Sequence, residues 1–393
     1  MRYTIGEMAE IIDGDRGKNY PQQHEFLDEG YCLFLNTGNV TKAGFSFDSN
    51  QFISKEKCDL LRKGKLQRHD IVYTTRGTVG NAAFYSDSIP YEHVRINSGM
   101  VIIRPKETIV CTEFLYQILK SDYYRPFFRK YCTGSAQPQL PIKNFSTIEL
   151  DLPDLPVQRF IAGILSSYDD LIENNQKQIK LLEEAAQRLY KEWFVDLRFP
   201  GHETTPIVDG VPEGWRRERL VDLVDVQYGY AFDGSLFNTA KNGMPIIRIR
   251  NIPSGNTGDY TTEEADSRYI VHNGDILVGM DGEFHINSWS GPDAYLVQRT
   301  CSFRPNNSEM KGYLLQAIYE PIKYFENTVV GATVAHLGKK HIDTINVLTC
   351  PTNLYVPLQD YYEQRQLLLN QNWLLAEARD RLLPKLMNGE LEV

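Results

Sequence analysis

Residues 157–194 read VQRFIAGILSSYDDLIENNQKQIKLLEEAAQRLYKEWF. This stretch contains no proline and one glycine, and its apolar residues recur with the spacing of an α-helix. They fall on two seven-residue lines that correspond to the d and a positions of a coiled coil. The d line holds one polar residue, Asn175. At about 1.5 Å per residue, such a helix would be roughly 55 Å long.

A second heptad stripe lies near the end of the chain. Tyr361, Leu368, Leu375 and Leu382 repeat every seven residues, and each is followed by an apolar neighbour. Either stripe could be a helix packed on its own domain, but long heptad runs usually pair with another helix. The two stripes are therefore predicted to pair with each other. The predicted coiled-coil seam comprises Leu165, Tyr168, Ile172, Asn175, Ile179, Leu182, Leu189, Trp193, Leu368, Leu375 and Leu382.

The chain also carries a weak internal duplication. Short segments of the first half recur, in the same order, in the second half. Single matches are at chance level, and their shared order is what indicates a repeat. The separation between partners shrinks steadily, as expected for two diverged copies with shorter loops in the second. The matched pairs are Ile11–Gly14 with Val226–Gly229, Phe34–Val40 with Ile246–Ile252, His69–Val72 with Gly274–Leu277, Arg104 with Arg304, Gly134 with Gly331, and Leu182 and Leu189 with Leu375 and Leu382.

Outside the heptad stripes, each copy alternates apolar and polar residues between Gly, Asn and Asp turns, which is typical of short strands. A turn-rich linker lies between Arg198 and Arg219. The predicted fold class is α+β, with two similar mixed α/β domains and two long coiled-coil helices. The expected domains are 1–156, the central helix 157–197, the linker and second domain 198–352, and the distal helix 353–393. Expected strands include Gln67–Thr74, Val94–Arg104, Pro245–Ile249 and Asp275–Val278, and the expected short helices are Thr112–Lys120 and Met310–Ile318.

Composition narrows the class of protein. A chain of 393 residues with 42% hydrophobic and 24% charged residues is typical of a globular protein of two to three domains. No apolar run is long enough to span a membrane, and the acidic N-terminal segment does not resemble a signal peptide, so a cytoplasmic protein is expected. The six cysteines form no Cys-x-x-Cys pair, which argues against a zinc finger and for free thiols. The net charge of −9 argues weakly against a nucleic-acid binder, but it does not exclude a local basic groove.

Catalytic motifs are scarce. The chain has no P-loop, no Gly-x-Gly-x-x-Gly, no His-Glu-x-x-His and no Gly-x-Ser-x-Gly. It also lacks the (Asn/Asp)-Pro-Pro-(Tyr/Phe) segment that an amino-methyltransferase requires. Asp293, Glu309 and Lys311 fit a loose nuclease pattern, whose chemistry would require them to converge on a metal ion. A carboxylate favoured near a helix start explains Glu309 equally well, so the endonuclease stays an alternative.

Residues suited to binding are better represented. Thr75 and Arg76 lie in a glycine-rich turn after a strand, which is either a site for phosphate or base contact or an ordinary hairpin turn. Arg248 and Arg250 alternate with isoleucine on an expected strand, so both should point to one face. Residues 123–131 interleave cations with aromatic rings, which suits phosphate contact or a core equally. The candidate DNA-binding residues are Arg16, Lys18, Thr75, Arg76, Ser135, Gln137, Lys143, Arg248, Arg250, Lys339 and Lys340.

Several segments resemble one known family. The stretches 156–166, 169–175 and 191–196 resemble the central conserved region of type I restriction–modification DNA-specificity subunits. Gly14–Pro21 and Pro212–Trp215 look like the entries to the two target-recognition domains of that family. Arg381–Leu391 is similar to its C-terminal end. One departure is visible, because the second copy lacks the full Gln-x-x-Ile-Ala-x-Ile-Leu stretch, so the distal helix is expected to begin differently.

The resemblance implies that two target-recognition domains each read one half of a split, asymmetric DNA site. It implies that the two helices pair antiparallel and hold the domains apart. It also implies that two methyltransferase (M) subunits dock on this scaffold and that restriction (R) subunits join them. The subunit itself would be no enzyme and would hold no metal or cofactor, with S-adenosylmethionine, ATP and Mg expected only on its partners. A stand-alone DNA-binding protein is a second alternative, beside the endonuclease.

Overall fold

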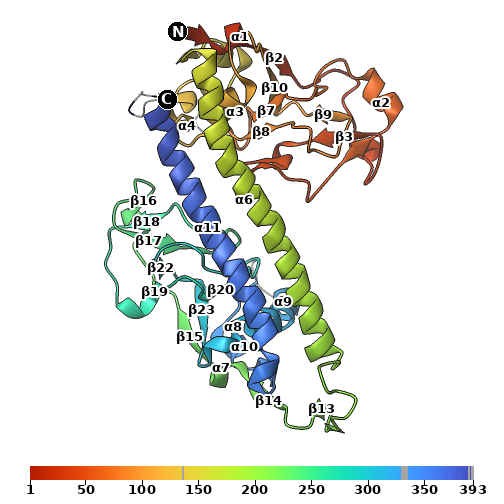
Figure 1. Ribbon diagram of the computed structural model, residues 1–393, viewed down its shortest axis with the longest axis vertical. Coiled ribbons are helices and arrows are strands. Elements are labelled where there is room, and N and C mark those ends of the chain that lie inside the picture. Colours follow the sequence, from red (N-terminus) through yellow and green to blue (C-terminus); the bar gives the residue numbers. More distant parts are fainter. Residues whose placement is uncertain (135–136, 329–334, 388–389, 391–393) are drawn as a thin grey trace. The chain divides into compact units, whose positions relative to one another are not determined.

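The computed structural model describes residues 1–134, 137–328, 335–387 and 390. The chain divides into two compact units (Figure 1), a first unit of Met1–Asp170 with Ala376–Val393 and a second unit of Leu171–Leu375. All six cysteines are free. None of the described helices combines the length and apolarity that crossing a lipid bilayer requires.

The first unit contains short strands and short helices in addition to parts of two long helices. The strands are β1 (Arg2–Thr4), β2 (Ala9–Asp13), β3 (Cys32–Leu35), β4 (Val40–Thr41), β5 (Gly44–Phe45), β6 (Phe52–Ile53), β7 (Ile71–Thr74), β8 (Ala82–Phe84), β9 (Val94–Ile96), β10 (Met100–Pro105) and β11 (Glu149–Asp151). The short helices are α1 (Ile5–Met8), α2 (Lys55–Leu60), α3 (Thr112–Lys120), α4 (Arg125–Arg129) and α5 (Ile142–Ser146), with 3-10 turns at Gln23–Glu25 and Thr37–Asn39.

The main sheet of the first unit has four strands in the order β2-β10-β7-β8. Its inner strand β10 is apolar and buried from Met100 to Ile103, because both faces of this part are covered. Val101 and Ile103 point into one core cluster, which includes Phe114 of α3. Met100 and Ile102 point into another, which includes residues of β3 and β9. Successive residues of a strand face opposite sides, so one short strand anchors two layers.

The second unit is built from a similar set of elements. The strands are β12 (Ile207–Val208), β13 (Val211–Pro212), β14 (Arg216–Arg219), β15 (Val224–Tyr228), β16 (Phe237–Asn238), β17 (Met244–Ile247), β18 (Tyr260–Thr261), β19 (Ile270–Val271), β20 (Ile276–Gly279), β21 (Ile286–Ser288), β22 (Ala294–Leu296), β23 (Thr300–Pro305) and β24 (Asn346–Thr349). The short helices are α7 (Leu220–Leu223), α8 (Lys311–Ala317), α9 (Tyr319–Thr328) and α10 (Lys339–Ile342), with 3-10 turns at Gly234–Leu236, Ile249–Asn251, Ser267–Tyr269, Ser308–Met310 and Thr352–Leu354.

Strand order in the two units confirms the duplication. The main sheet of the second unit runs β15-β23-β20-β21, which repeats the order β2-β10-β7-β8. The antiparallel pair β14–β24 corresponds to β1–β11, and the parallel pair β17–β22 corresponds to β3–β9. The register also agrees, because Met100 faces Thr74 as Thr300 faces Gly279. The two units therefore share one backbone frame.

Local expectations from the sequence were right for helices and less accurate for strands. The expected helix Thr112–Lys120 is α3 with the same bounds. The expected strand 94–104 is in fact β9 and β10 joined by a turn. The expected strand 245–249 was wrong at its end, because β17 stops at Ile247 and a 3-10 turn begins at Ile249. In that turn Asn251 accepts a hydrogen bond from the backbone N–H of Arg248 at 2.9 Å, which closes the chain and ends the strand.

The two long helices are α6 (Leu155–Tyr190), continued by a π-helical turn at Lys191–Val195, and α11 (Val356–Met387). Pro156 fits the first turn of α6, where a missing N–H is tolerated. Within the second unit, the Asn175 amide of α6 donates to Asn372 of α11 at 3.0 Å. Glu183 of α6 accepts from Arg365 of α11 at 2.6 Å. Because the contacts on α11 move backward as those on α6 move forward, the helices are antiparallel.

Residues of the predicted seam pack both against the other long helix and against the core of the unit in which they lie. Ile161 and Leu165 belong to the core cluster of the first unit, together with Leu383 of α11. Ala186 belongs to the core cluster of the second unit, against which Leu189 and Trp193 also pack. The ends of α6 thus pack on their own domains as well as on α11, which was the alternative interpretation of the stripe. Leu165, Asn175 and Ile179 are buried, whereas Tyr168, Ile172, Leu182, Leu189, Trp193, Leu368, Leu375 and Leu382 are half-buried.

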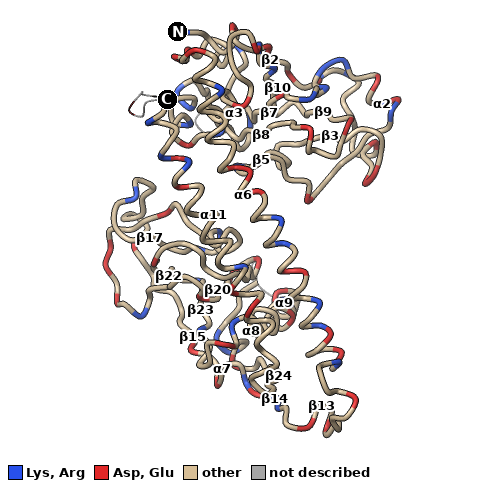
Figure 2. The backbone as a smooth tube through the Cα atoms, viewed as in Figure 1, with Lys and Arg blue, Asp and Glu red and all other residues tan. Residues whose placement is uncertain are grey.

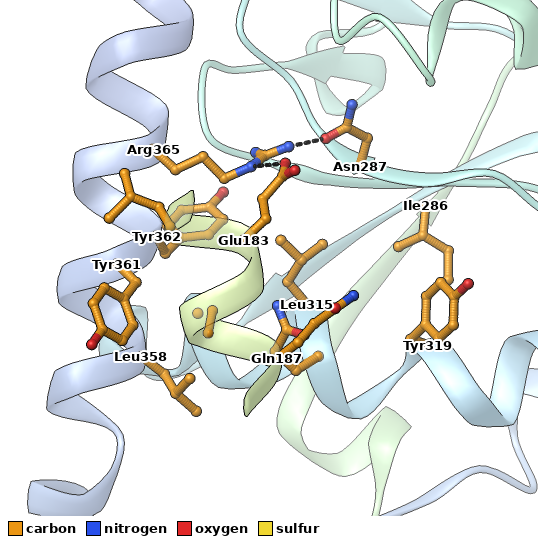
Figure 3. Close-up of a pocket in the computed structure, with 14 residues that line it drawn as sticks. Glu183, Gln187, Ile286, Asn287, Leu315, Tyr319, Leu358, Tyr361, Tyr362 and Arg365 are labelled. Carbon is orange, nitrogen blue, oxygen red and sulfur yellow. Dashed lines mark hydrogen bonds and ion pairs between the residues drawn. The ribbon is translucent and has the colours of Figure 1, made fainter. Parts of the chain in front are cut away.

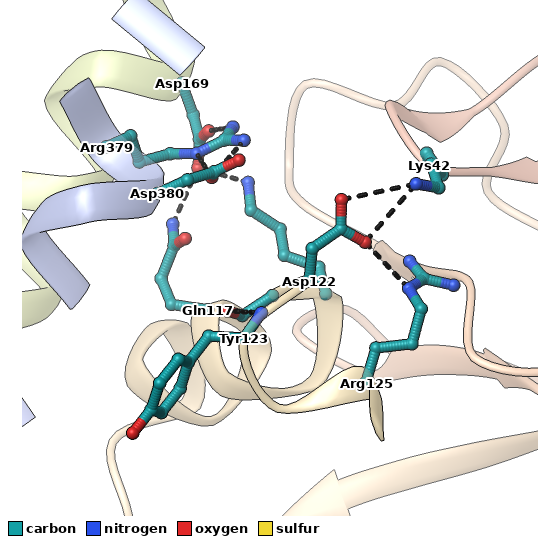
Figure 4. Close-up of polar contacts among 10 residues, drawn as sticks. Lys42, Gln117, Asp122, Tyr123, Arg125, Asp169, Arg379 and Asp380 are labelled. Atoms are coloured by element: carbon teal, nitrogen blue, oxygen red, sulfur yellow. Dashed lines mark hydrogen bonds and ion pairs between the residues drawn. The ribbon is translucent and has the colours of Figure 1, made fainter. Parts of the chain in front are cut away.

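A half-buried carboxylate joins both long helices to α3 in the first unit (Figure 4). Asp169 of α6 accepts hydrogen bonds from Lys120 at 2.5 Å and from Gln117 at 2.6 Å, both on α3. Its other oxygen accepts from Arg379 of α11 at 2.7 Å. Burial alone would raise the pKa of Asp169, but Lys120, Gln117 and Arg379 outweigh that effect and hold the pKa below its ordinary value.

A buried guanidinium has the corresponding place in the second unit (Figure 3). Arg365 of α11 donates to Glu183 of α6 at 2.6 Å. It also donates to Ser288 at 2.7 Å and to Asn287 at 2.8 Å, both on β21. Gln366 beside it donates to the carbonyl of Trp289 at 2.6 Å. Because every polar atom of this buried group has a partner, the strand β21 is held to both helices.

The Asp169 cluster yields a stability prediction. Asp169→Asn should destabilise the chain by about 3 kcal/mol, because it leaves the partly buried Lys120 without its counter-charge and leaves Arg379 with Asp380 as its remaining partner. The pKa of Asp169 is lowered on folding, so its contribution is present above the unfolded pKa of about 4 and is lost as the pH falls through the folded value. Urea unfolding at pH 7 and in acid measures both effects. Asp170→Asn, an exposed neighbour, is the control, and equal midpoints for the two variants would contradict the role of the cluster.

The seam yields a second prediction. Ile179 is 8% exposed, whereas Leu181 on the same helix is 65% exposed. Ile179→Asp should lower the free energy of unfolding by about 3–5 kcal/mol, because it removes a buried side chain and buries a charge. Leu181→Asp, the matched control, should change it by about 0.5 kcal/mol or less. Similar urea midpoints for both variants would show that this face of α6 is not a packed seam.

Candidate nucleic-acid interface

Two candidate residues of the first unit, Thr75 and Arg76, lie in a loop that connects two strands of the main sheet. Arg76 lies in the β7–β8 hairpin, as the hairpin interpretation anticipated. The backbone N–H groups of Thr75 and Arg76 both donate to the carbonyl of Gly99, at 2.9 and 3.1 Å. The buried Thr75 hydroxyl donates to the same carbonyl at 3.1 Å. Thr75 therefore holds the loop in place, and Arg76 is the residue whose side chain can reach a ligand.

Arg76 differs from most arginines of the chain. In the part of the chain that the structure describes, its guanidinium has no ion pair and no hydrogen bond, although the side chain is half-buried. A rigid backbone and an unpaired planar cation suit bidentate recognition of a guanine or a phosphate. Arg16 is instead engaged, with Asp13 at 3.1 Å and the carbonyl of Ser98 at 3.3 Å.

The remaining candidates of the first unit are exposed. Lys18, Gln137 and Lys143 lie at the surface, and Ser135 lies outside the described residues. Asp15, which directly precedes Arg16, accepts hydrogen bonds from the backbone N–H groups of Gly17 at 2.8 Å and Arg62 at 2.7 Å. The Gly17 bond is the main cause that holds the pKa of Asp15 below its ordinary value. The segment that carries Arg16 and Lys18 is thus anchored by a buried carboxylate.

The expectation that Arg248 and Arg250 point to one face of a strand was wrong. Both leave the strand, since β17 ends at Ile247 and Arg250 lies in the 3-10 turn. Arg250 donates to both oxygens of Asp259, at 2.7 and 2.6 Å, so its charge is already neutralised. The Arg248 guanidinium lies 5.5 Å from the centroid of the Phe237 ring and has no carboxylate partner among the described residues. The two arginines are therefore chemically distinct.

A shallow hollow of the second unit brings several of these side chains together. Arg248, Arg250, Arg299 and Gln298 line it. Phe232 and Phe237 form its apolar part. A hollow that combines guanidinium groups, an amide and aromatic rings offers both hydrogen-bond donors and stacking surfaces for a nucleotide.

Lys339 and Lys340 open the short helix α10, and both are exposed. Neither ammonium group has an ion pair within residues 1–134, 137–328, 335–387 and 390. In the second copy of the repeat, α10 occupies the place that α5 has in the first. Lys143 of α5 is also exposed. The preceding Gly331, which the sequence matched with Gly134, lies outside the described residues. Figure 2 shows basic and acidic residues interspersed along the backbone of each unit.

The aromatic segment 123–131 belongs mainly to the core. Phe128 is buried, and Tyr124, Phe127 and Tyr131 pack against the same cluster. Tyr123 is 54% exposed, and Arg125 is tied to Asp122 at 2.8 Å. Of the two interpretations of this segment, the structural one applies to most of its rings.

The nuclease alternative fails on geometry. Asp293 pairs with His272 at 2.9 Å, and Lys311 donates to the carbonyl of Gly274 at 3.0 Å. Glu309 lies in a 3-10 turn that precedes α8. Among the described residues, no group of three or more His, Cys, Asp or Glu side chains could hold a metal ion.

Sequence reasoning missed a polar cluster in the second unit. His336 Nδ1 lies 2.6 Å from Asp281, and Arg299 Nε lies 3.3 Å from the other oxygen of that carboxylate. These residues are far apart in the sequence, and no motif links them. The internal duplication could have pointed to this cluster, because the strand register places Asp281 at the position that Arg76 has in the first unit.

Comparison with known proteins gives a consistent result. The model of the family "Type I restriction modification DNA specificity domain" matches residues 1–184 and 212–353. The MjaIX specificity subunit of a type I restriction enzyme from Methanocaldococcus jannaschii is 27% identical over 346 residues, which cover 82% of this chain and 78% of the relative. The HindI specificity subunit from Haemophilus influenzae is 22% identical over an alignment that covers 98% of this chain and all of the relative. The crystal structure of a type I S subunit from M. genitalium has a similar fold, with a TM-score of 0.54, 14% identity, and coverage of 98% of this chain and 95% of that one.

Proposed function

The chain belongs to the type I restriction–modification DNA specificity family, and we propose that it reads a split, asymmetric DNA site with one recognition domain for each half. The domains would be residues 1–156 and 198–352, joined to the helical segments 157–197 and 353–393. One observation carries the proposal. The two units share strand order and register but differ in the polar side chains on their loops. A shared frame with different loop chemistry is what two different half-sites require.

Membership of the family settles the class of protein. Specificity subunits are non-catalytic and carry no catalytic cofactor. The endonuclease alternative, which would use Asp293, Glu309 and Lys311, is thereby rejected. What distinguishes one member from another is the DNA sequence that it selects.

Within the proposed interface, we assign different tasks to arginines and lysines. Arg76 and Arg248 would read bases, because each offers an unpaired planar fork that matches the O6 and N7 atoms of guanine. Lys339 and Lys340 would contact phosphates as point charges. Lys18, Gln137 and Lys143 would support backbone contacts, whereas Arg16 and Arg250 are held by Asp13 and Asp259. With a net charge of −9, the chain needs positive surface from its partners for tight binding.

The partners proposed are two M subunits, joined by R subunits, on the two long helices. Four leucines of these helices are strongly exposed within the second unit. Leu171 and Leu181 of α6 are 52% and 65% exposed, and Leu367 and Leu374 of α11 are 57% and 56% exposed. Leu367 and Leu374 are seven residues apart and so share one helix face. Exposed leucines on a helix otherwise rich in charge are typical of a docking surface. A DNA-reading complex also implies a cytoplasmic location.

The first test of the function separates base reading from phosphate binding. In the complex with its methyltransferase subunit, Arg76→Ala should cost about 1–3 kcal/mol on the specific duplex and relax one position of one half-site. Lys339→Ala should weaken binding to specific and scrambled duplexes alike and lower the salt dependence by about one unit of slope. Titrations at several salt concentrations measure both effects. An equal loss on both duplexes for Arg76→Ala would make Arg76 a backbone contact.

The second test concerns the docking surface. Leu367→Glu combined with Leu374→Glu should abolish co-purification with the methyltransferase subunit, because it places charge on an apolar contact. Tyr324→Glu is the matched control, since Tyr324 is 64% exposed and belongs to α9, not to either long helix. The melting temperature should be unchanged in both variants. If wild-type chain co-purified with no methyltransferase, the stand-alone DNA-binding alternative would stand, and if the double variant still did, this surface would be excluded.

A further inference from the structure

Three loops of the second unit meet at one place. They are the β20–β21 hairpin, the turn between β22 and β23, and residues 335–338 before α10; strands β20, β22 and β23 are labelled in Figure 1. The backbone of Met280 donates to the carbonyl of Arg299 at 2.9 Å, and Leu337 donates to the carbonyl of Met280 at 2.8 Å. Gly282 donates to the carbonyl of Ala335 at 3.0 Å. Backbone bonds therefore hold the three loops in fixed positions.

The side chains at this junction are joined as well. We call Asp281, Arg299 and His336 the three-loop site. His336 Nδ1 lies 2.6 Å from Asp281 Oδ1, and Arg299 Nε lies 3.3 Å from Asp281 Oδ2. The Arg299 and His336 side chains are 55% and 47% exposed. The cluster therefore joins three loops and faces solvent.

The backbone of Arg299 is strained. Its φ is +69°, in the left-handed region that favours glycine and, to a lesser extent, asparagine. A bulky side chain in this conformation persists where the surroundings hold it, and such residues concentrate at functional sites. Arg299 also lines the hollow that contains Arg248. The strain therefore places a guanidinium at the edge of the candidate interface.

The same place in the first unit carries different side chains. There Thr75 donates to the carbonyl of Gly99 at 2.9 Å, and Leu140 donates to the carbonyl of Thr75 at 2.9 Å. These bonds match those of Met280 and Leu337, so Asp281, Arg299 and His336 correspond to Arg76, Gly99 and Gln139. The backbone frame is kept while every side chain differs. Residues that vary on a constant frame are those that could give two domains different specificities.

We propose that the three-loop site is a base-reading site of the second recognition domain, in which Arg299 recognises a guanine and Asp281 and His336 position its guanidinium. The inference rests on the proposed function and adds the residue and the base. Arg299 Nε lies 3.3 Å from Asp281 Oδ2, and its Nη1 lies 3.3 Å from His336 Nδ1. Nη2 and the second hydrogen of Nη1 remain available as donors to O6 and N7 of a guanine. His336 Nδ1 also lies 2.6 Å from Asp281 Oδ1, so both residues fix the position of the guanidinium. The pairing of Arg299 with Asp281 also spares the DNA a bare negative charge.

The test uses the full chain in complex with its methyltransferase subunit and a library of duplexes with random sequence. Arg299→Gly removes the side chain, and glycine adopts a φ of +69° without strain, so the variant should keep the melting temperature of the wild type. It should lose discrimination at one guanine of one half-site by roughly 5- to 150-fold. The other positions and the other half-site should be unchanged. Arg299→Asn, which also tolerates this conformation, should give the same result.

Two further variants separate positioning from structure. Asp281→Asn keeps the shape but loses the charge that steers Arg299, so it should weaken the preference at that same guanine and nowhere else. Arg219→Ala is the control, because Arg219 is 59% exposed and paired with Asp222 at 2.8 Å, yet lies on β14 outside the three loops. It should leave the selected sequence unchanged.

The outcomes distinguish the inference from the function. If the wild-type complex selected no split sequence, the proposed function itself would fail. If it did so and Arg299→Gly selected the same sequence with the same preference, only the three-loop site would be overturned. A uniform loss of preference at both half-sites in Arg299→Gly would also overturn it, since a structural role would act on the whole interface.

Discussion

In the first unit, one carboxylate ties the recognition domain to both long helices. Asp169 accepts from Lys120 and Gln117 of α3 and from Arg379 of α11, while it belongs to α6 itself. Such a buried ionic cluster adds less to stability than its short distances suggest, because desolvation offsets much of the attraction. Its value is geometric, since three segments can satisfy one carboxylate in only one arrangement. The orientation of α3, and of the sheet beneath it, relative to the helices follows from that constraint.

The second unit meets the same requirement with the opposite charge. Arg365 of α11 binds Glu183 of α6 and the polar side chains of β21. The two copies therefore share a backbone frame but use side chains of opposite charge to attach it to the long helices. The loops show the same behaviour, with Arg76 in one unit at the place of Asp281 in the other. Buried apolar strands such as β10 and β23 keep the frame constant, and this constancy leaves the loop side chains free to differ.

The sequence predicted the elements that have a long, regular signal. The heptad lines predicted α6 and α11, and the 3.6-residue period gave α3 with its observed bounds. It misplaced Arg248 and Arg250, because a 3-10 turn closed by Asn251 has no periodicity to detect. It could not show that Asp259 neutralises Arg250, since that pairing depends on where a loop returns. The sequence also did not reveal the cluster of Asp281, Arg299 and His336, because only the tertiary structure brings these residues together.

Several arginines are paired with acidic side chains. This pairing would affect both how tightly such a chain binds DNA and how well it discriminates between DNA sequences. Arg16, Arg250 and Arg299 each carry a nearby carboxylate, on Asp13, Asp259 and Asp281 respectively. A paired guanidinium contributes little to the long-range attraction for phosphate, because its field is cancelled within a few ångströms. It is nevertheless held in one orientation, which favours recognition of one base edge over another. A chain with a net charge of −9 and several such pairs would bind random DNA weakly. Discrimination would then reside in the recognition domains, while most of the phosphate attraction would have to come from the partner subunits.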